Sequence, residues 1–231
     1  MGARPAAPDD AAAATIGLFT TLPIFWAESP DLQGFLRSDS QPHWALSALR
    51  QYGEVHALDS LLAAEGAEPL SRIALLVMAQ PRALSPQENV ALDRWVTQGG
   101  RLLLFADPLL TEDSAYAIGD RRRPQDVILL SPILTHWGLH LAFDEDQRAG
   151  ERAVALFGGS LPVDLPGRLT RANVGRGCAV LAGGIAASCR IGRGRVLVVA
   201  DAALLEKDRT EAASGHRDML ERLLAELDRH R

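Results

Sequence analysis

The fold is decided by residues 73–108, which read IALLVMAQPRALSPQENVALDRWVTQGGRLLLFADP. Residues 73–78 form a continuous apolar run, as expected of a strand covered on both faces. Residues 85–88, Ser-Pro-Gln-Glu, are a capping box with proline at the first helical position, and Gly99 and Gly100 end the helix that it starts. Residues 102–105 then form a second buried strand. Strand, helix and strand in this order predict a βαβ crossover, and therefore a parallel pair of strands.

Apolar runs on either side extend this unit into a larger sheet. Further buried strands are predicted at 15–20, 54–58 and 196–199. Helices are predicted at 43–52 and at 219–227, the second with leucines on one face, and Asp59 or Ser60 would cap a short helix ending near Gly66. We therefore expect an α/β fold with a mainly parallel sheet and helices on both faces.

The second half of the chain predicts less regular structure. A polar stretch at 111–125 is expected to be a loop, and 126–137 to be a helix that Gly138 ends. Residues 139–143 alternate apolar and polar side chains, which indicates a half-buried strand. Strand-and-turn sequence begins at 153–157, and 178–191 is expected to add a β-hairpin region to the fold.

The hairpin has a glycine pair at its centre, Gly183-Gly184, which is a strong signal for a two-residue turn. Ala182 would then pair with Ile185 at the turn, and Cys178 would lie opposite Cys189. Counting outward places the two cysteines on a hydrogen-bonded pair, where α-carbons are ~5.5 Å apart and side chains diverge. We expect adjacent but reduced thiols. Two cysteines are too few for a disulfide scaffold and lack the spacing of a zinc site, and no further metal ligands are apparent.

Composition narrows the classes of function. The chain has 231 residues and a formal net charge of -5, with 47% hydrophobic and 23% charged residues, as in an ordinary folded globule. Its longest basic block is only Arg121-Arg122-Arg123, which argues against a nucleic-acid binder. No apolar run approaches the ~20 residues that span a bilayer.

The domain organisation is expected to be simple. Residues 1–14 are rich in alanine, proline and aspartate and indicate a disordered lead-in rather than a signal peptide. Residues 15–231 are expected to form one domain, although two small domains also fit this length. The default compartment is the cytoplasm, with membrane association through a partner as the alternative; a lost membrane anchor would leave the same pattern.

Several segments resemble one known family. The stretch from the strand at 73–78 through "Ser-Pro-Gln-Glu" and "Gly-Gly-Arg-Leu-Leu-Leu-Phe-Ala-Asp-Pro" is similar to the auxiliary domain of gliding-motility and uncharacterised ABC-type transport systems. "Thr-Leu-Pro" at 21–23, "His-Trp-Gly-Leu" at 136–139 and "Gly-Arg-Gly-Arg-Val-Leu-Val-Val-Ala-Asp" at 192–201 fit the same pattern. That domain is related to the intraflagellar-transport domain and, more remotely, to class I glutamine amidotransferases.

The resemblance implies a flavodoxin-like or amidotransferase-like sheet and a binding or scaffolding role beside a transporter ATPase or permease. It implies no catalytic residue and no cofactor. The chain departs from true amidotransferases, because neither cysteine lies on a tight turn between a strand and a helix. It also lacks the membrane segments that relatives often carry.

Candidate ligand-binding residues gather at the predicted carboxyl ends of the strands, where open α/β sheets bind ligands. Asp107 and Asp201 each follow a central strand, and Thr20-Thr21, Glu28 and Gln80 are expected at the same edge. Such oxygens suit a divalent cation or a sugar. The alternative is that each aspartate caps a turn or helix start through backbone N–H groups.

Candidate partner-binding residues lie in two loops. Phe25 and Trp26 would form an aromatic platform for a ligand or partner, or else pack onto the sheet edge. Arg121, Arg122 and Arg123 would dock an anion or acidic partner, or else form a solvated loop. His136 and His140 are four residues apart, but Gly138 between them argues against a shared zinc site.

These residues leave three hypotheses open. The first is a non-catalytic binding domain for a protein or small polar ligand, as part of an ABC-type system. The second is a hydrolase, metal-dependent or acting on a glycan, that uses Asp107 and Asp201. The third is an oligomerisation unit that uses the Trp26 loop. Close carboxylates in a pocket, with a raised pKa, would favour the enzyme, whereas carboxylates bonded to local backbone N–H groups would favour the binding domain.

Overall fold

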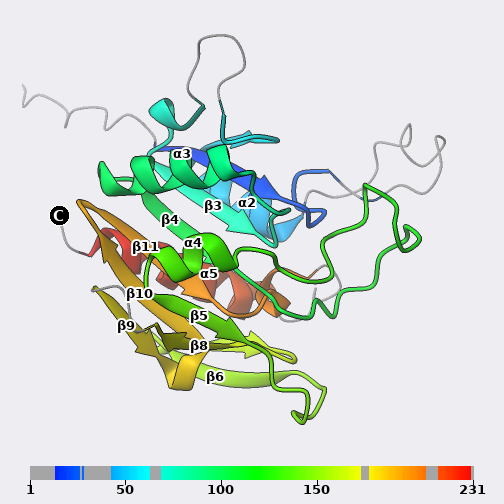
Figure 1. Cartoon of the computed structure of the whole chain (residues 1–231). Coiled ribbons are helices and arrows are strands. Elements are labelled where there is room, and N and C mark those ends of the chain that lie inside the picture. The colour runs from blue at the N-terminus through cyan, green and yellow to red at the C-terminus, as the bar shows by residue number, and fades with distance from the viewer. Residues whose placement is uncertain are drawn as a thin grey trace, which may run out of the picture.

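The computed structural model describes residues 14–26, 28, 43–62, 69–172, 177–206 and 213–229. Its centre is a seven-stranded sheet in the order β2-β1-β3-β4-β11-β10-β9 (Figure 1). The strands of this sheet are β2 (Gly53–Ala57), β1 (Ala14–Thr20), β3 (Leu75–Ala79), β4 (Arg101–Phe105), β11 (Gly194–Val199), β10 (Ala186–Ile191) and β9 (Cys178–Leu181). The first five are parallel to one another, and β10 runs antiparallel to both of its neighbours.

The predicted βαβ unit is present. Helix α3 (Pro86–Thr97) connects β3 to β4, which are parallel with Leu75 opposite Arg101. Its capping box is complete, because the Glu88 N–H donates to Ser85 Oγ at 3.2 Å and the Ser85 N–H donates to Glu88 Oε2 at 2.9 Å. The sequence signal and the local structure therefore agree at both ends of the helix.

Helices cover both faces of the sheet, as expected. Helices α2 (Trp44–Tyr52) and α5 (Ala213–Asp228) pack on one face, while α3 and α4 (Ser131–His136) pack on the other (Figure 1). Alternate residues of each central strand serve the two cores: in β4, Leu103 and Phe105 face α2 and α5, and Leu102 and Leu104 face α3 and α4. The sheet is thus a shared wall between two apolar layers.

Two small antiparallel pairs lie outside the main sheet, and three short 3-10 turns complete the described elements. The pairs are β5 (Leu139–Ala142) with β8 (Arg168–Arg171), and β6 (Arg152–Leu156) with β7 (Gly159–Val163). The 3-10 turns are η1 (Pro69–Arg72), η2 (Ala182–Gly184) and η3 (Ala203–Leu205). The strand predicted at 139–143 therefore exists, but it pairs only with β8.

The helix predicted at 126–137 is shorter than expected. Residues 126–130 are not helical, because their backbone bonds to the loop that follows β4. The Leu110 N–H donates to the Asp126 carbonyl at 2.9 Å, and the Ile128 N–H donates to the Asp107 carbonyl at 3.1 Å. Residues 126–130 instead form part of this loop, and α4 begins only at Ser131.

The hairpin of β9 and β10 keeps the predicted pairing but not the predicted turn. Leu181 lies opposite Ala186, so the loop has four residues rather than two. The Arg190 N–H donates to the Gly177 carbonyl at 2.9 Å, which makes that pair the hydrogen-bonded one and the adjacent cysteine pair the non-hydrogen-bonded one.

The expectation of reduced thiols is therefore wrong. In a non-hydrogen-bonded pair the α-carbons come closest. The α-carbons of Cys178 and Cys189 are 4.0 Å apart, and a disulfide joins the two side chains. Because the loop is longer than predicted, the cysteine pair lies at a non-hydrogen-bonded position of the ladder instead of the predicted hydrogen-bonded one.

Some expectations lie partly outside the described residues. Of the lead-in at 1–14, only Ala14 is described, and it is the first residue of β1. Of the short helix expected after Asp59, only 59–62 are described, and they are not helical. Over the described parts of the chain, no helix combines the length and apolar character needed to cross a membrane.

Candidate functional site

Asp107 and Asp201 lie together at the carboxyl edge of the sheet. They follow β4 and β11, which are parallel neighbours in register, so the two chain segments leave the sheet side by side. Both residues are buried, with exposed fractions of 0% and 1%. The two aspartates therefore lie at the same edge of the sheet, as expected from their positions after two central strands, but neither carboxylate faces solvent.

The two carboxylates bind backbone N–H groups. Asp107 accepts from the Leu109 N–H at 2.9 Å and from the Ala202 N–H at 3.1 Å. Asp201 accepts from the Ala203 N–H at 2.6 Å and from the Asp164 N–H at 2.9 Å. Each side chain thus fixes the turn that follows its own strand and reaches across to a neighbouring segment, as the capping alternative predicts.

Burial dominates the electrostatics of this pair. It raises the pKa of Asp107 to about 7, against the lowering effect of the two backbone N–H groups, and Glu206 and Asp164 raise it further. Burial and then the charge of Asp107 raise the pKa of Asp201 well above its ordinary range. Two like charges in a poorly solvated site oppose each other, so the pair does not carry two full negative charges near neutral pH.

Gln80 connects β3 to this edge. Its Nε2 donates to the Asp107 carbonyl at 3.0 Å and to the Gln125 carbonyl at 2.8 Å, and its Oε1 accepts from the Asp107 N–H at 3.0 Å. Thr21 joins the same network, because its hydroxyl donates to the Gln80 carbonyl and accepts from the Gln125 N–H. Four predicted site residues, Thr21, Gln80, Asp107 and Asp201, therefore lie together, with these polar atoms bonded mainly to backbone.

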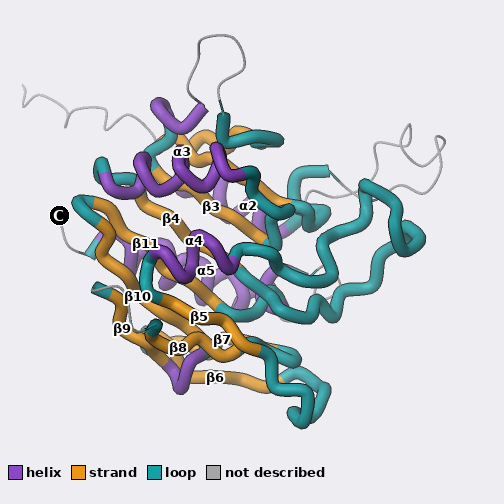
Figure 2. The backbone as a smooth tube through the Cα atoms, viewed as in Figure 1, coloured by secondary structure: helices purple, strands orange, loops and turns teal. Residues whose placement is uncertain are grey.

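Glu28 lies apart from this cluster. Its carboxylate accepts from the Ser114 hydroxyl and from the Ala115 N–H, both at 2.7 Å. It thereby ties the segment after β1 to the long loop at 106–130, which projects from the sheet as the teal segment between β4 and α4 in Figure 2. Glu28 positions a loop rather than adding an oxygen to the cluster.

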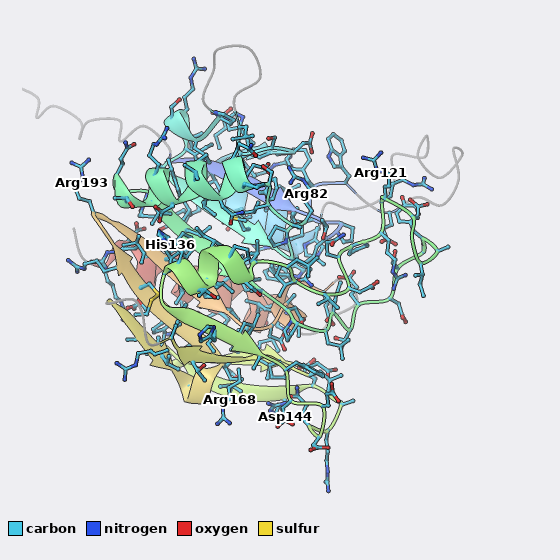
Figure 3. The ribbon with its side chains drawn as sticks, viewed as in Figure 1. Arg82, Arg121, His136, Asp144, Arg168 and Arg193 are labelled. Atoms are coloured by element: carbon cyan, nitrogen blue, oxygen red, sulfur yellow. A yellow bond between two sulfur atoms is a disulfide. The ribbon has the colours of Figure 1, made fainter. Side chains whose placement is uncertain are left out.

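The arginine triplet is largely neutralised within its own loop. Arg122 pairs with Asp120 at 2.8 Å and lies over the ring of Tyr116 at 4.3 Å. Arg123 pairs with Asp126 at 2.9 Å. Arg121 is exposed near the tip of the loop (Figure 3). Two of the three guanidiniums of the predicted basic patch are therefore paired with aspartates of the same loop.

Large apolar side chains are exposed on the same loops. Trp26 is 70% exposed, with the ring of Phe25 edge-on at 5.0 Å, and Ile118, Val127 and Leu129 are 88%, 48% and 56% exposed. Phe25 is partly buried against the core, and we call these five residues the loop surface. Sequence reasoning found Phe25 and Trp26 but missed the other three. Residues 127–130 are all apolar, so the sequence gives no signal that Val127 and Leu129 face out while the two residues between and after them are buried.

Neither of the two histidines considered as zinc ligands, His136 and His140, is placed to bind a metal. His136 lies at the end of α4, 3.4 Å from Asp93, and His140 is exposed on β5 (Figure 3 shows His136). Among the described residues, no group of three or more histidine, cysteine, aspartate or glutamate side chains is arranged to hold a metal ion.

The sequence did not predict an ion pair at the start of α3 between a buried glutamate, Glu88, and a partly exposed arginine, Arg82. Glu88 is 2% exposed and accepts from Arg82 Nη2 at 2.7 Å, and Arg82 also lies over the ring of Phe19 at 5.0 Å. The hydrogen bond from Arg82 is the main reason that the pKa of Glu88 is lowered to about 2. The Leu61 N–H donates to the same carboxylate, so Glu88 joins the capping box to the chain after β2.

The fold and the site define an α/β domain with a mainly parallel sheet whose edge carboxylates bind the backbone. Among the described strand ends at this edge, none carries a cysteine or serine on a sharp turn into a helix. The chain belongs to the family described as "ABC-type uncharacterized transport system", as an auxiliary domain, because that family's model matches residues 14–147, more than half of the chain.

Solved structures share the fold at low sequence identity. An exo-β-1,4-mannosidase from Opitutaceae bacterium strain TAV5 is 15% identical with a TM-score of 0.56, over 92% of this chain and 36% of that one. A β-galactosidase from Rahnella sp. R3 is 14% identical with a TM-score of 0.52, over 94% of this chain and 31% of that one. A cytoplasmic protein from Salmonella typhimurium is 11% identical with a TM-score of 0.54, over 93% of this chain and 98% of that one.

These similarities show the fold alone. The chain spans about a third of the length of the two glycosidases, and the Salmonella protein is matched over nearly its whole length. No curated protein gave a match.

Proposed function

We propose that this chain is a non-catalytic, amidotransferase-like docking domain of an ABC-type transport system, which binds a protein partner of that system through the loop surface. Family membership supports the transport context. The observation that carries the proposal is the contrast at the carboxyl edge. The carboxylates there are buried and bonded to backbone N–H groups, while large apolar side chains are exposed on the adjacent loops, among charged ones.

An exposed tryptophan with an aromatic neighbour is typical of the residues that dominate binding energy in protein interfaces. Trp26 is held next to Phe25, and Glu28 fixes the adjoining segment to the long loop through Ser114. Preorganised loops lose less conformational entropy on binding. The Arg121 guanidinium near the tip of the loop adds a charge for an acidic group at the rim.

A hydrolase that uses Asp107 and Asp201 is the second candidate, and one observation favours it: the raised pKa of both carboxylates. A general acid must touch its substrate, however, and these side chains are 0% and 1% exposed. Burial alone raises a carboxyl pKa, so the shift is expected of an enzyme and of a buried turn alike. The docking domain accounts for both the burial and the backbone bonds.

The disulfide supports a revised proposal for the compartment. Disulfides persist in oxidising environments and are rare in the cytosol of mesophiles. We therefore propose an oxidising compartment rather than the cytoplasm expected by default. Mass spectrometry of chain trapped with a thiol alkylator in its native host tests this: labelled Cys178 and Cys189 would contradict it.

The docking proposal is tested by co-expressing this chain with the ATPase and permease of an ABC-type transport system from its native host. We expect the three to co-purify on size-exclusion chromatography, and the double substitution Trp26→Ser with Ile118→Ser to weaken the complex at least tenfold. The matched control is Val90→Ser, which removes an apolar side chain that is 58% exposed on α3, away from these loops. Equal recovery of the complex with the double variant, or no complex with the wild type, would rule out docking through the loop surface.

A further inference from the structure

A groove of about 840 Å³ runs along one side of α3, between that helix and the chain that connects β2 to β3 (Figure 1). The helix contributes Val90, Arg94 and Trp95 to it, and the connecting chain contributes Leu61 and Leu62. Leu61 is buried, whereas Leu62 and Val90 are exposed, so the groove has an apolar floor and open apolar walls. Its volume lies within the range of small-molecule sites.

Hydrogen bonds hold the two walls of the groove together. In the first turn of α3, the Glu88 carboxylate accepts from the Leu61 N–H and from the Ser60 hydroxyl, both at 3.2 Å. The Leu62 N–H donates to the same hydroxyl at 3.1 Å. The leucine wall is therefore fixed to the helix before any ligand arrives, and a preorganised site loses less conformational entropy on binding.

The indole of Trp95 is fixed by the glycine that follows the helix. A Cβ at Gly100 would lie 2.4 Å from Cδ2 of that indole, so the ring lies against the turn in a space that only glycine leaves open. The ring is partly buried and packs against the apolar core under α3. Trp95 therefore gives the groove a rigid apolar surface near the end of the helix.

Arg94 is the only charged residue among the described residues that line the groove. It is exposed and forms no ion pair with another described residue. The residues three and four positions before and after it are uncharged, so no pair forms along the helix. Asp93 lies on the other flank of α3, where it accepts from Trp137 Nε1 at 2.8 Å and lies 3.4 Å from His136. The end of the helix adds only about half a negative charge.

We infer that this groove binds a free monocarboxylate with a single alkyl chain, whose chain lies against the leucines and Trp95 and whose carboxylate pairs with Arg94. An apolar hollow with one cation complements one anionic group joined to an apolar chain, and a guanidinium matches a carboxylate with two parallel hydrogen bonds. An anionic membrane is a poorer match, because its recognition takes a cluster of basic residues. The groove is separate from the loop surface, so this inference does not depend on docking.

The test is isothermal titration calorimetry of the full chain with dodecanoate, kept below the concentration at which it forms micelles. We expect saturable one-to-one binding to the wild type and at least fivefold weaker binding to Arg94→Gln, which removes the charge and keeps a good helix former. Leu62→Ser should weaken binding severalfold. Dodecyltrimethylammonium, which has the same chain and the opposite charge, should bind the wild type at least tenfold more weakly. The matched control is Arg50→Gln, at an exposed arginine of α2 on the other face of the sheet, which should bind as the wild type does.

Variants of the two surfaces keep this test apart from the docking test. The double variant Trp26→Ser with Ile118→Ser should bind dodecanoate as the wild type does, whereas Val90→Ser should weaken dodecanoate severalfold and leave docking through the loop surface unchanged. The inference is overturned if the wild type does not bind dodecanoate, if Arg94→Gln binds it as tightly as the wild type, or if the cationic amphiphile binds equally well. Sedimentation with phosphatidylglycerol vesicles, without binding of dodecanoate, would assign the groove to a membrane surface instead.

Discussion

Asp107 shows how burial and hydrogen bonding act in opposite directions on one side chain. Its two backbone bonds favour the charged form, but loss of solvent outweighs them and raises the pKa to about 7. In the folded chain the carboxyl therefore holds its proton more tightly than in the unfolded chain, where the ordinary value is 3.8. Stability linked to this group is full below that value and is lost as the pH rises through about 7.

We therefore predict that the chain is more stable at pH 5 than at pH 8. The melting temperature should fall by roughly 5 °C over this interval, which is a few kcal/mol for a chain of this size. Asp107→Asn should reduce the fall by at least half, because the amide does not titrate. Differential scanning fluorimetry at several pH values measures this.

The control variant is Asp113→Asn, at an exposed aspartate of the long loop at 106–130, which should leave the fall in melting temperature unchanged. A melting temperature that rises from pH 5 to pH 8 would show that Asp107 is charged without cost in the fold. The lowered pKa of Glu88, about 2, does not interfere, because its contribution is lost only at much lower pH.

At the residue scale, sequence reasoning placed the aspartates but not their partners. Asp107 and Asp201 follow apolar runs, so the position of each at the carboxyl edge could be predicted. The N–H groups that they bind come from residues whose approach depends on the whole fold, such as Asp164. The ion pair of Arg82 with Glu88 was missed because a capping box already accounted for the glutamate.

At the scale of elements, the hairpin of β9 and β10 joins the sheet by a covalent link. The Cys178–Cys189 disulfide closes a loop with a sequence separation of 11, and closing a loop of this size stabilises a fold by about 3 kcal/mol. We predict that Cys178→Ser with Cys189→Ser lowers the free energy of unfolding by that order, measured by urea denaturation. Wild type in dithiothreitol should match the double variant, and the variant should not respond to dithiothreitol. Two titratable thiols in unreduced wild type would contradict the disulfide.

Two glycines allow a matched comparison of backbone requirements. At Gly194 a Cβ would lie 1.9 Å from one backbone oxygen and 2.5 Å from another, so the turn or α3 must shift. At Gly183 no atom lies within 4 Å, but φ is 67°, which strains an alanine by about 1 kcal/mol. We predict that Gly194→Ala destabilises by more than 2 kcal/mol or prevents folding, and that Gly183→Ala costs about 1 kcal/mol. Equal losses in urea denaturation would refute the close packing at Gly194.

Element boundaries were predictable where local signals and packing agree. Helix α3 has a capping box and a glycine stop, and it runs as expected. The helix expected at 126–137 starts only at Ser131, because the backbone of residues 126–130 bonds to the chain after β4. No local sequence signal indicates this contact between distant segments. The two-residue turn predicted at Gly183-Gly184 was wrong, because η2 and Ile185 together form a four-residue loop between β9 and β10.

At the scale of the whole molecule, the same strands serve both cores. Leu102 and Leu104 of β4 pack on α3 and α4, and Leu103 and Phe105 pack on α2 and α5. If either helical layer came away, it would expose one face of the same strands that support the other layer. We predict one cooperative transition in scanning calorimetry, with equal calorimetric and van't Hoff enthalpies, as for a single domain over 15–231. Two resolved transitions would instead support two small domains.

The overall architecture was predictable in part. Continuous apolar runs at 73–78, 102–105 and 196–199 indicate strands covered on both faces, and all three are central in the sheet. The exclusion of 139–143 from that sheet was not predictable, because alternation of apolar and polar residues fits any half-buried strand. The loop surface was only half predicted, since exposure depends on which face of an extended segment meets the core.

The paired hydrogen bonds between the Gln80 side chain and the main chain of Asp107 have a consequence for how much change the long loop tolerates. They extend the seam between β3 and β4 one step past the last ladder pair, Ala79 with Phe105. Local unfolding that starts in the long loop must break these two hydrogen bonds before it reaches the strands. Insertions and substitutions in that loop should therefore leave the strands of the sheet largely undisturbed.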